Sequence, residues 1–328
     1  MGKRDLLRKR FFERGVEAIN VLTGKNDAFY YCPICTRPFS KTALERKELT
    51  LEHIPPEAQG GKGIALTCSR CNHTAGITVD AAVFDRNKVL EIEPLVTQTG
   101  EYKGRVRLNL GEKGLEAINC DLSVKDSFVR IYLLKDRNHP DSSERIKDFF
   151  QRLNQTPDHE RPNININTRK RYHPWHSKVG DLRTAYLLCF ASLGYRYVFD
   201  KRLVPVRNQL MRYSEKIING FWLQSDHTDE PDTNIYIIDK PFSALSVRLG
   251  KVFVLLPWFD SPEDFYSYLL LEYPNGGRMN FTASRLPWPN TLETKFDFIK
   301  RRDEINTQST QQLYATDGEK HGGTDTAS

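Results

Sequence analysis

Two Cys-x-x-Cys pairs, Cys32/Cys35 and Cys68/Cys71, constrain this chain more than any other feature of its sequence. Each pair presents two thiolates from one tight turn, and two such turns complete a tetrahedron of sulfur atoms about 2.3 Å from a zinc ion. A redox Cys-x-x-Cys would explain one pair and leave the other without a role. The spacing therefore predicts a structural Zn²⁺ site with these four ligands.

The composition fits a folded chain. With 328 residues, the chain has room for about two domains. Its hydrophobic residues make up 39%, enough to bury a sizeable core, which excludes a wholly disordered or collagen-like protein. The two remaining cysteines, Cys120 and Cys189, stand alone in apolar surroundings, and we expect them to be small core residues.

The sequence favours a cytoplasmic location. No apolar run approaches the roughly 20 residues that a membrane crossing needs, and the longest, Ala185 to Leu193, is amphipathic. The first residues lack the apolar stretch and cleavage site of a signal peptide. We therefore expect no membrane partner, and reduced thiols that bind metal rather than form disulfides.

Positive charge is concentrated at the N-terminal end. Residues 1–88 hold 15 Lys and Arg against 10 Asp and Glu, which is +5, whereas the remainder holds 33 against 32, which is +1. A local basic field favours a polyanionic partner, although solvated surface charge alone also produces such a bias.

Hydrophobic periodicity gives the order of elements around the cysteines. Residues 4–22 predict a helix that stops near Gly24. After the first cysteine pair we expect a strand over 48–53 ended by Pro55 and Pro56, a loop over 56–63, a second strand over 64–67 and a helix over 72–84.

The rest of the chain alternates strand and helix patterns. Strands are predicted over 105–110, 128–134, 163–167, 235–238, 244–247 and 252–256, with helices over 141–153 and 178–193. We thus predict an α+β protein with a basic helix (1–28), a zinc-stabilised module (29–88), a larger mixed α+β domain (89–303) and a disordered tail (304–328).

The candidate catalytic residues lie between the cysteine pairs or directly after them. Its 32 residues, 36–67, are more than a zinc ribbon needs and include Glu52-His53, while Asn72 directly follows the last cysteine. An imidazole takes a proton from water near neutral pH, and carboxylate and amide oxygens hold a hard divalent cation. This combination suits phosphodiester hydrolysis. The zinc would not be catalytic, because four thiolates leave it no open position.

These motifs resemble a known superfamily. Cys32-Pro-Ile-Cys35, Leu51-Glu52-His53-Ile54-Pro55, Gly60-Gly61-Lys62 and Leu66-Thr67-Cys68-Ser-Arg-Cys71-Asn72 are similar to the HNH endonucleases, in particular to the branch with four zinc cysteines that includes phage recombination endonuclease VII. The similarity covers residues 29–86.

The resemblance implies a ββα-metal fold with the histidine on the first strand and the last ligand at the start of the helix. It implies that His53 is the general base, and that Glu52 and Asn72 hold a catalytic Mg²⁺ or Mn²⁺. Zinc would be bound by the four cysteines. The expected products are DNA ends with a 5′-phosphate and a 3′-hydroxyl.

The sequence also departs from the family pattern. Many members carry an Asn between the histidine and the second cysteine pair, but residues 54–67 contain only Gln59 as a side-chain amide. Asn72 replaces the more frequent final histidine, and the neighbouring His73 is the alternative ligand. Adjacent strand residues point to opposite faces, so Glu52 and His53 share a site only if the strand is distorted near Pro55.

Other residues are weaker candidates for nucleic-acid contacts. Lys62 and Arg70 are predicted to contact phosphate, although exposed cations are ordinary on any surface. A basic run at Arg169–Arg171 is either a second contact or a solvated loop. Base stacking or core packing would each explain a set of aromatic residues near the long helix: Trp175, Tyr186, Phe190, Tyr195 and Tyr197.

Two functions follow from these observations. The first is a metal-dependent endonuclease acting on DNA, with RNA as the alternative substrate, for example in restriction or phage defence. Residues 89–303 would then select the target or dock a partner, including a second copy of the chain. The second is a zinc-dependent nucleic-acid-binding protein that does not cleave. Glu52, His53 and Asn72 favour the nuclease, because a pure binder has no reason to hold them in this order.

Overall fold

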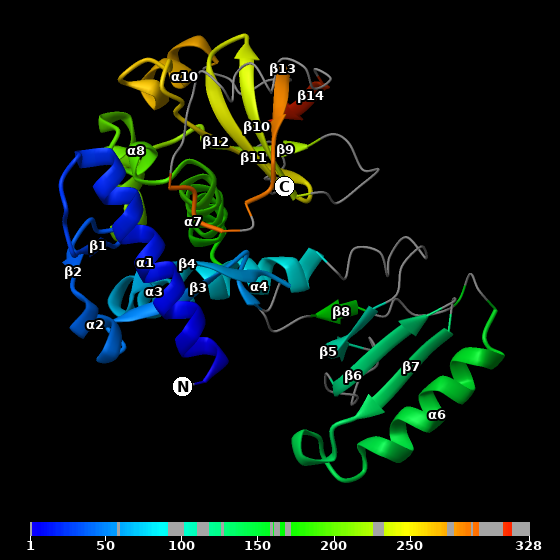
Figure 1. Cartoon of the computed structure of the whole chain (residues 1–328). Helices are drawn as coiled ribbons and strands as arrows, with labels where there is room; N and C mark the ends of the chain where they lie inside the picture. The colour runs from blue at the N-terminus through cyan, green and yellow to red at the C-terminus, as the bar shows by residue number, and fades with distance from the viewer. Residues whose placement is uncertain are drawn as a thin grey trace. The chain divides into compact units, whose positions relative to one another are not determined.

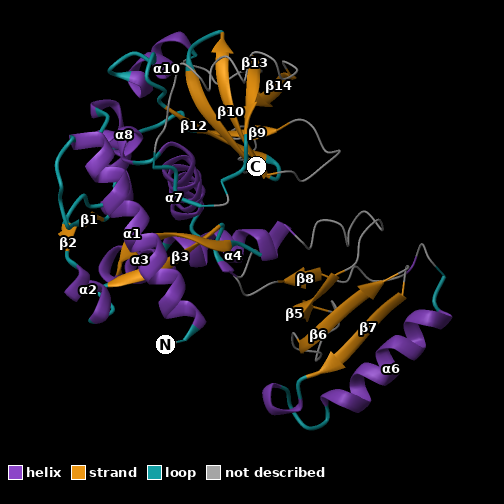
Figure 2. Ribbon diagram, in the orientation of Figure 1, coloured by secondary structure: helices purple, strands orange, loops and turns teal. Residues whose placement is uncertain are grey.

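The structure, a computed structural model, mixes helices and strands (Figures 1 and 2). It describes residues 2–57, 60–90, 102–109, 118–125, 128–157, 160, 165–167, 172–225, 233–273, 279–289, 291–294 and 311–316. The chain forms two compact units, one of residues 1–83 with 174–328 and one of residues 84–173. This division differs from the expected one, because the predicted α+β domain of 89–303 is shared between the two units.

The N-terminal part of the first unit contains both cysteine pairs. Its elements are α1 (Lys3–Thr23), β1 (Tyr30–Tyr31), β2 (Pro38–Phe39), α2 (Lys41–Glu45), β3 (Leu49–Ile54), β4 (Lys62–Cys68), α3 (Ser69–Ile77) and the first residues of α4 (Val79–Leu90), which continues into the second unit. Strands β3 and β4 form an antiparallel pair, and α3 follows β4 directly. The two predicted strands are confirmed. The single helix predicted over 72–84 is two helices, because the backbone leaves helical geometry at Thr78 (φ −120°, ψ −82°).

Helix α1 ends where its sequence predicts. Gly24 takes the left-handed conformation (φ 66°), and its N–H donates to the carbonyl of Asn20. Glycine adopts this conformation without the steric cost that a Cβ brings, so it ends a helix readily. The apolar side of α1, which includes Phe11, Phe12 and Ile19, is buried in the core of the unit.

Helix α7 (Pro174–Leu193) is the central element of the first unit. It contacts β3 and β4 of the cysteine-containing part and also β11 and β12 of the C-terminal sheet. Most of its side chains are buried, including Leu182, Leu187 and Leu188. A helix that is apolar on nearly all sides suits a position inside a core.

A closed six-stranded antiparallel barrel completes this unit (Figure 1). The strand order is β10 (Thr233–Lys240), β11 (Ala244–Leu249), β12 (Val252–Leu256), β9 (Trp222–Ser225), β14 (Gln311–Thr316) and β13 (Met279–Leu286). Three short elements precede β9 in the chain: α8 (Tyr195–Val198), the 3₁₀ turn Lys201–Leu203 and α9 (Val204–Met211). Helix α10 (Phe265–Glu272) lies between β12 and β13. Residues 311–316, which lie in the segment predicted to be disordered, form β14, and this strand pairs with both β13 and β9.

The second unit has a four-stranded sheet in the order β7 (Phe128–Leu133), β6 (Ile118–Lys125), β5 (Tyr102–Asn109) and β8 (Asn165–Asn167). A 3₁₀ turn at Lys135–Arg137 precedes α6 (Ser142–Gln155). Ile146 and Phe149 of α6 pack with sheet residues that include Cys120. Cys120 and, in the first unit, Cys189 are fully buried, which confirms both as core residues.

The aromatic residues near α7 belong to the core rather than to a stacking surface. Tyr186, Phe190, Tyr195 and Tyr197 are each at most 1% exposed. Trp175 is half-buried, and its indole N–H donates to the carbonyl of Tyr213 at 2.9 Å. The core-packing interpretation is therefore confirmed for the four buried rings. The basic run at 169–171 lies outside the described residues.

Among the described residues, no helix combines the length and the apolar character that a membrane crossing requires.

Shortening a buried side chain of α7 tests whether this helix lies in the core of the first unit. Leu188 is completely buried, so Leu188→Ala should lower the free energy of unfolding by about 2–5 kcal/mol through lost transfer energy and a residual cavity. Urea unfolding followed by circular dichroism measures the change. The control is Leu271→Ala on α10, where the side chain is 78% exposed and the expected change is within about 0.5 kcal/mol. Equal effects of the two variants would contradict the burial of α7.

Candidate functional site

The four predicted zinc ligands lie together. Cys32 and Cys35 come from the turn between β1 and β2, Cys68 ends β4, and Cys71 lies in the first turn of α3. Their sulfur atoms all lie within 4.8 Å of one another, and Cys35 Sγ is 3.7 Å from Cys68 Sγ. A regular tetrahedron with Zn–S bonds of about 2.3 Å has sulfur atoms about 3.8 Å apart. The cluster therefore has the donor type of a structural zinc site and a spacing close to that of one.

The local backbone explains why the first cysteine pair forms a tight turn. The N–H of Thr36 donates to the carbonyl of Cys32 at 2.8 Å, and the N–H of Cys32 donates to the carbonyl of Arg37 at 3.0 Å. Thr36 has a positive φ of 54°, which is uncommon for a β-branched residue and marks a constrained turn. Both sulfur atoms thereby face the same side.

Hydrogen-bond donors surround the sulfur atoms. The backbone N–H of Cys68 donates to Cys32 Sγ at 3.4 Å, and the Arg37 guanidinium donates to Cys68 Sγ at 3.7 Å. Four thiolates around Zn²⁺ would carry a net charge of −2, which these donors and the Arg37 cation would stabilise.

The thiol pKa values are unequal. Hydrogen bonds from neighbouring thiols, with Cys32 the largest contributor, lower the pKa of Cys35, and a hydrogen bond with Cys32 contributes most to lowering the pKa of Cys68 to about 6. Burial raises the pKa of Cys32. Part of the cluster therefore ionises readily, and a metal ion must displace the remaining protons, so acid competes with metal for these ligands.

Glu52 and His53 are neighbours on β3, at an irregular point of the strand. Glu52 pairs with Ala65 and His53 with Gly63, so the register of β3 against β4 shifts between these two residues. Such irregularities turn side chains away from strict alternation. Glu52 is 3% exposed and His53 is half-buried. The strand is thus irregular between Glu52 and His53, two residues before Pro55, which is near the place where a site shared by these two side chains requires a distortion.

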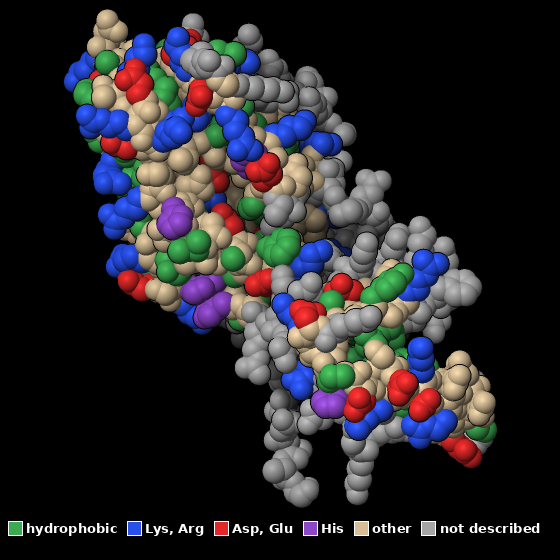
Figure 3. Space-filling view, turned by 90° about the horizontal axis from the view of Figure 1, so that it is seen from below, with side chains coloured by type: hydrophobic (Ala, Val, Ile, Leu, Met, Phe, Trp, Pro, Cys, Tyr) green, Lys and Arg blue, Asp and Glu red, His purple; other side chains and the backbone are tan. Residues whose placement is uncertain are grey.

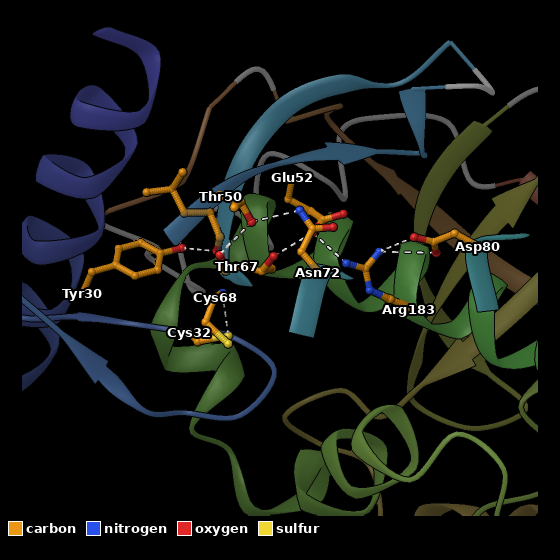
Figure 4. Close-up of polar contacts among 10 residues, drawn as sticks. Tyr30, Cys32, Thr50, Glu52, Thr67, Cys68, Asn72, Asp80 and Arg183 are labelled. Atoms are coloured by element: carbon orange, nitrogen blue, oxygen red, sulfur yellow. Dashed lines mark hydrogen bonds and ion pairs between the residues drawn. The ribbon is translucent and has the colours of Figure 1, made fainter. Parts of the chain in front are cut away.

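The Glu52 carboxylate is engaged inside the protein. Its Oε2 accepts a hydrogen bond from Thr67 Oγ1 at 2.7 Å and one from the Arg183 guanidinium at 2.6 Å. Arg183 also forms an ion pair with Asp80 at 3.2 Å (Figure 4). Burial raises the pKa of Asp80 although Arg183 opposes this. Burial works against the charge of Arg183 itself, but Glu52 and Asp80 raise its pKa.

Asn72 lies one turn into α3 and belongs to the same hydrogen-bond network. Its Nδ2 donates to Thr50 Oγ1 at 3.0 Å, and Thr50 Oγ1 donates to the carbonyl of Thr67 at 3.3 Å. The network therefore links Asn72 to Glu52 through two threonines, as Figure 4 shows. Asn72 does not act as the helix cap, because Cys68 occupies that position. Within the described residues, Asn72 Oδ1 and Glu52 Oε1 accept no hydrogen bond.

A shallow groove of about 730 Å³ runs along the exposed side of α3. Its lining includes Thr50, Arg70, Asn72 and His73. Glu52 and His53 are not among its lining residues, so the groove exposes one part of the candidate site and not the other. Arg70 and Lys62 are both exposed, as contact with a phosphate backbone requires.

The glycine pair in the β3–β4 loop has a geometric role. Gly60 has a positive φ of 78°, and a Cβ added to Gly61 would lie 1.5 Å from the carbonyl oxygen of Pro55. The loop therefore folds back on the end of β3 at a distance that only glycine permits.

Sequence reasoning missed Arg183 and Asp80. The available signal was a charged residue in the middle of α7, a helix that is otherwise mainly apolar. Fully buried arginines almost always have a partner. However, nothing in the local sequence identifies Glu52, which is 131 positions away, as that partner.

Comparisons with models of protein families, with curated proteins and with solved structures found no match to this chain. The four-cysteine cluster is thus defined by its geometry alone.

Loss of one thiolate tests the metal cluster. Cys68→Ser should lose bound zinc and destabilise residues 29–88, because the free energy of metal binding at such sites is folding free energy. Elemental analysis of the purified protein gives zinc per chain, and limited proteolysis reports the folding of this segment. Cys120→Ala, in the other unit, is the matched control and should retain zinc. Full zinc content in Cys68→Ser would contradict the assignment.

Proposed function

We propose that the chain is a metal-dependent endonuclease of the HNH type. The observation that carries the proposal is the order of elements between the cysteine pairs: β3 with His53, the antiparallel strand β4, and α3 with Asn72 in its first turns. The resemblance of the motifs to the HNH family implies the same ββα order. The four-cysteine cluster supports this proposal, because a zinc ion bound there would tie the β1–β2 turn to the junction of β4 and α3 and so form a scaffold.

His53 is the proposed general base. It would take a proton from the attacking water, which imidazole does well near neutral pH. Glu52 Oε1 and Asn72 Oδ1 are hard oxygen donors without a hydrogen-bond partner among the described residues, and they would hold Mg²⁺ or Mn²⁺. When bound, the cation supplies charge stabilisation for the phosphorane and the leaving oxygen.

DNA is the proposed substrate, with RNA as the alternative. The basic bias of residues 1–88 and the exposed Lys62 and Arg70 support a polyanionic partner. In Figure 3, Lys and Arg side chains also form a row along one edge of the first unit.

One observation favours the alternative function, a zinc-dependent binder that does not cleave. The Glu52 carboxylate is buried and paired with Arg183, as a purely structural carboxylate would be. In such a protein the zinc cluster and the basic residues would serve binding only. Cleavage assays separate the two functions.

Replacement of the proposed base tests cleavage. Wild-type protein with plasmid DNA and Mg²⁺ or Mn²⁺ should nick or linearise the plasmid, and a chelator should stop the reaction. His53→Ala should lose activity by about 10²–10⁴-fold, the usual contribution of a general base, while zinc content and DNA binding persist. Gel electrophoresis of the plasmid measures the rate.

Two further histidine variants complete this test. His73→Ala examines the alternative ligand, and His139→Ala, in the other unit and exposed, is the control and should cleave normally. Equal cleavage by His53→Ala and wild type would reject His53 as the base. Absence of cleavage of DNA and RNA with every divalent cation would favour the binder.

Salt dependence tests the proposed phosphate contacts. Lys62→Ala and Arg70→Ala should each weaken DNA binding and reduce the slope of log K against log salt concentration by about 1. Fluorescence anisotropy with a labelled duplex measures both quantities. Lys251→Ala, an exposed lysine at the β11–β12 turn, is the control. An unchanged slope in the first two variants would show that these side chains do not contact phosphate.

A further inference from the structure

The buried charge cluster of Glu52, Arg183 and Asp80 is the most unusual feature of the site. Arg183 and Glu52 side chains are 3% and 4% exposed, and the Asp80 side chain is 14% exposed. Taking charged groups out of water is costly, and well-packed apolar residues of similar size are often at least as stabilising. Stability by itself is thus a weak reason for this arrangement.

The guanidinium of Arg183 joins two segments that are distant in the sequence. One terminal nitrogen donates to Glu52 Oε2 at 2.6 Å, and the other contacts Asp80 at 3.2 Å. Arginine presents its donors in a rigid planar fork, so it fixes the orientation of both carboxyl groups in a way that lysine does not. Arg183 Nε is buried and has no hydrogen-bond partner among the described residues, so these two contacts and packing hold the side chain in place.

The contacts of Glu52 are one-sided. Thr67 and Arg183 both donate to Oε2, whereas Oε1 accepts nothing from the described residues. Two donors on a single oxygen fix the plane and the direction of the carboxyl group. The cluster also holds two carboxyl groups for one guanidinium, so it has an acidic group beyond what Arg183 neutralises.

We propose that Arg183 is a positioning residue for the cation site: with Thr67 it holds Glu52 Oε2 and leaves Oε1 as the ligand. This inference rests on the proposed function and extends it, because the cation site then depends on α7 as well as on the zinc module. Asp80 holds the guanidinium in place from the opposite side through its ion pair with Arg183. Partners of this kind behind a metal ligand typically change metal affinity or activity by about 10–100-fold.

Manganese affinity tests the proposal without relying on cleavage. The full-length, zinc-loaded protein is titrated with Mn²⁺, and free Mn²⁺ is followed by electron paramagnetic resonance. Arg183→Lys keeps the charge but loses the fork, and it should weaken Mn²⁺ binding about 10-fold or more. At saturating Mn²⁺ its cleavage rate should approach that of wild type, so the defect lies in the cation requirement. Zinc content and thermal unfolding confirm that the variant is folded.

Two other variants keep the test decisive. Arg202→Lys alters a second arginine–aspartate pair, Arg202–Asp200, away from the site, and should leave Mn²⁺ affinity unchanged. Thr67→Val removes the other donor to Oε2 with little change in volume and should also weaken Mn²⁺ binding. If Arg183→Lys fails to fold, the Mn²⁺ affinity of Thr67→Val decides whether the donors to Oε2 position Glu52.

The outcomes separate the positioning role from the proposed function. If wild type binds Mn²⁺ and cleaves, but Arg183→Lys and Thr67→Val bind Mn²⁺ as tightly, the positioning role is overturned and the nuclease proposal stands. If wild type neither binds Mn²⁺ nor cleaves, both are overturned. Weaker Mn²⁺ binding in the two variants, with the Arg202→Lys control unchanged, supports the positioning role.

Discussion

The close approach of four cysteine sulfur atoms, in a geometry that suits zinc, is the constraint on which the N-terminal part of the first unit depends. It ties the β1–β2 turn to the junction of β4 and α3, two places more than 30 residues apart in the chain. The β3–β4 pair contributes Leu49, Ile54, Ile64 and Leu66 to the core that α1 and α7 also build. A zinc ion bound by the four cysteines would add to this burial and would fix the direction of α3.

Helix α7 joins the cysteine-containing part of the first unit to the C-terminal barrel. Its apolar surface packs against the barrel strands on one side and against β3 and β4 on another. A charged Arg183 within that surface would be costly without partners, and Glu52 and Asp80 provide them. The same contacts orient the carboxyl group that the nuclease proposal needs. Packing and site geometry are therefore coupled through a single side chain.

Sequence patterns predicted the elements that depend on near neighbours. The stop of α1 at Gly24, the end of β3 at Pro55 and the helix over 178–193 are local signals, and each appears in the structure, although the run Ala185–Leu193 is buried on nearly all sides rather than amphipathic. The barrel was not predicted as a closed sheet, because closure depends on the pairing of β14 with β9, about 90 residues earlier. The polar sequence of β14 gives no indication that this segment completes a sheet.

The sequence alone determined the four-cysteine cluster, because two closely spaced cysteine pairs leave few other arrangements for four thiolates around one metal ion. It also named Glu52, His53 and Asn72 as a group through their order along the chain. Only the tertiary structure decided how the Glu52 carboxylate is used. Its partner Arg183 lies on a helix that reaches β3 through packing of the core, and contacts between such distant segments leave no pattern in either local sequence.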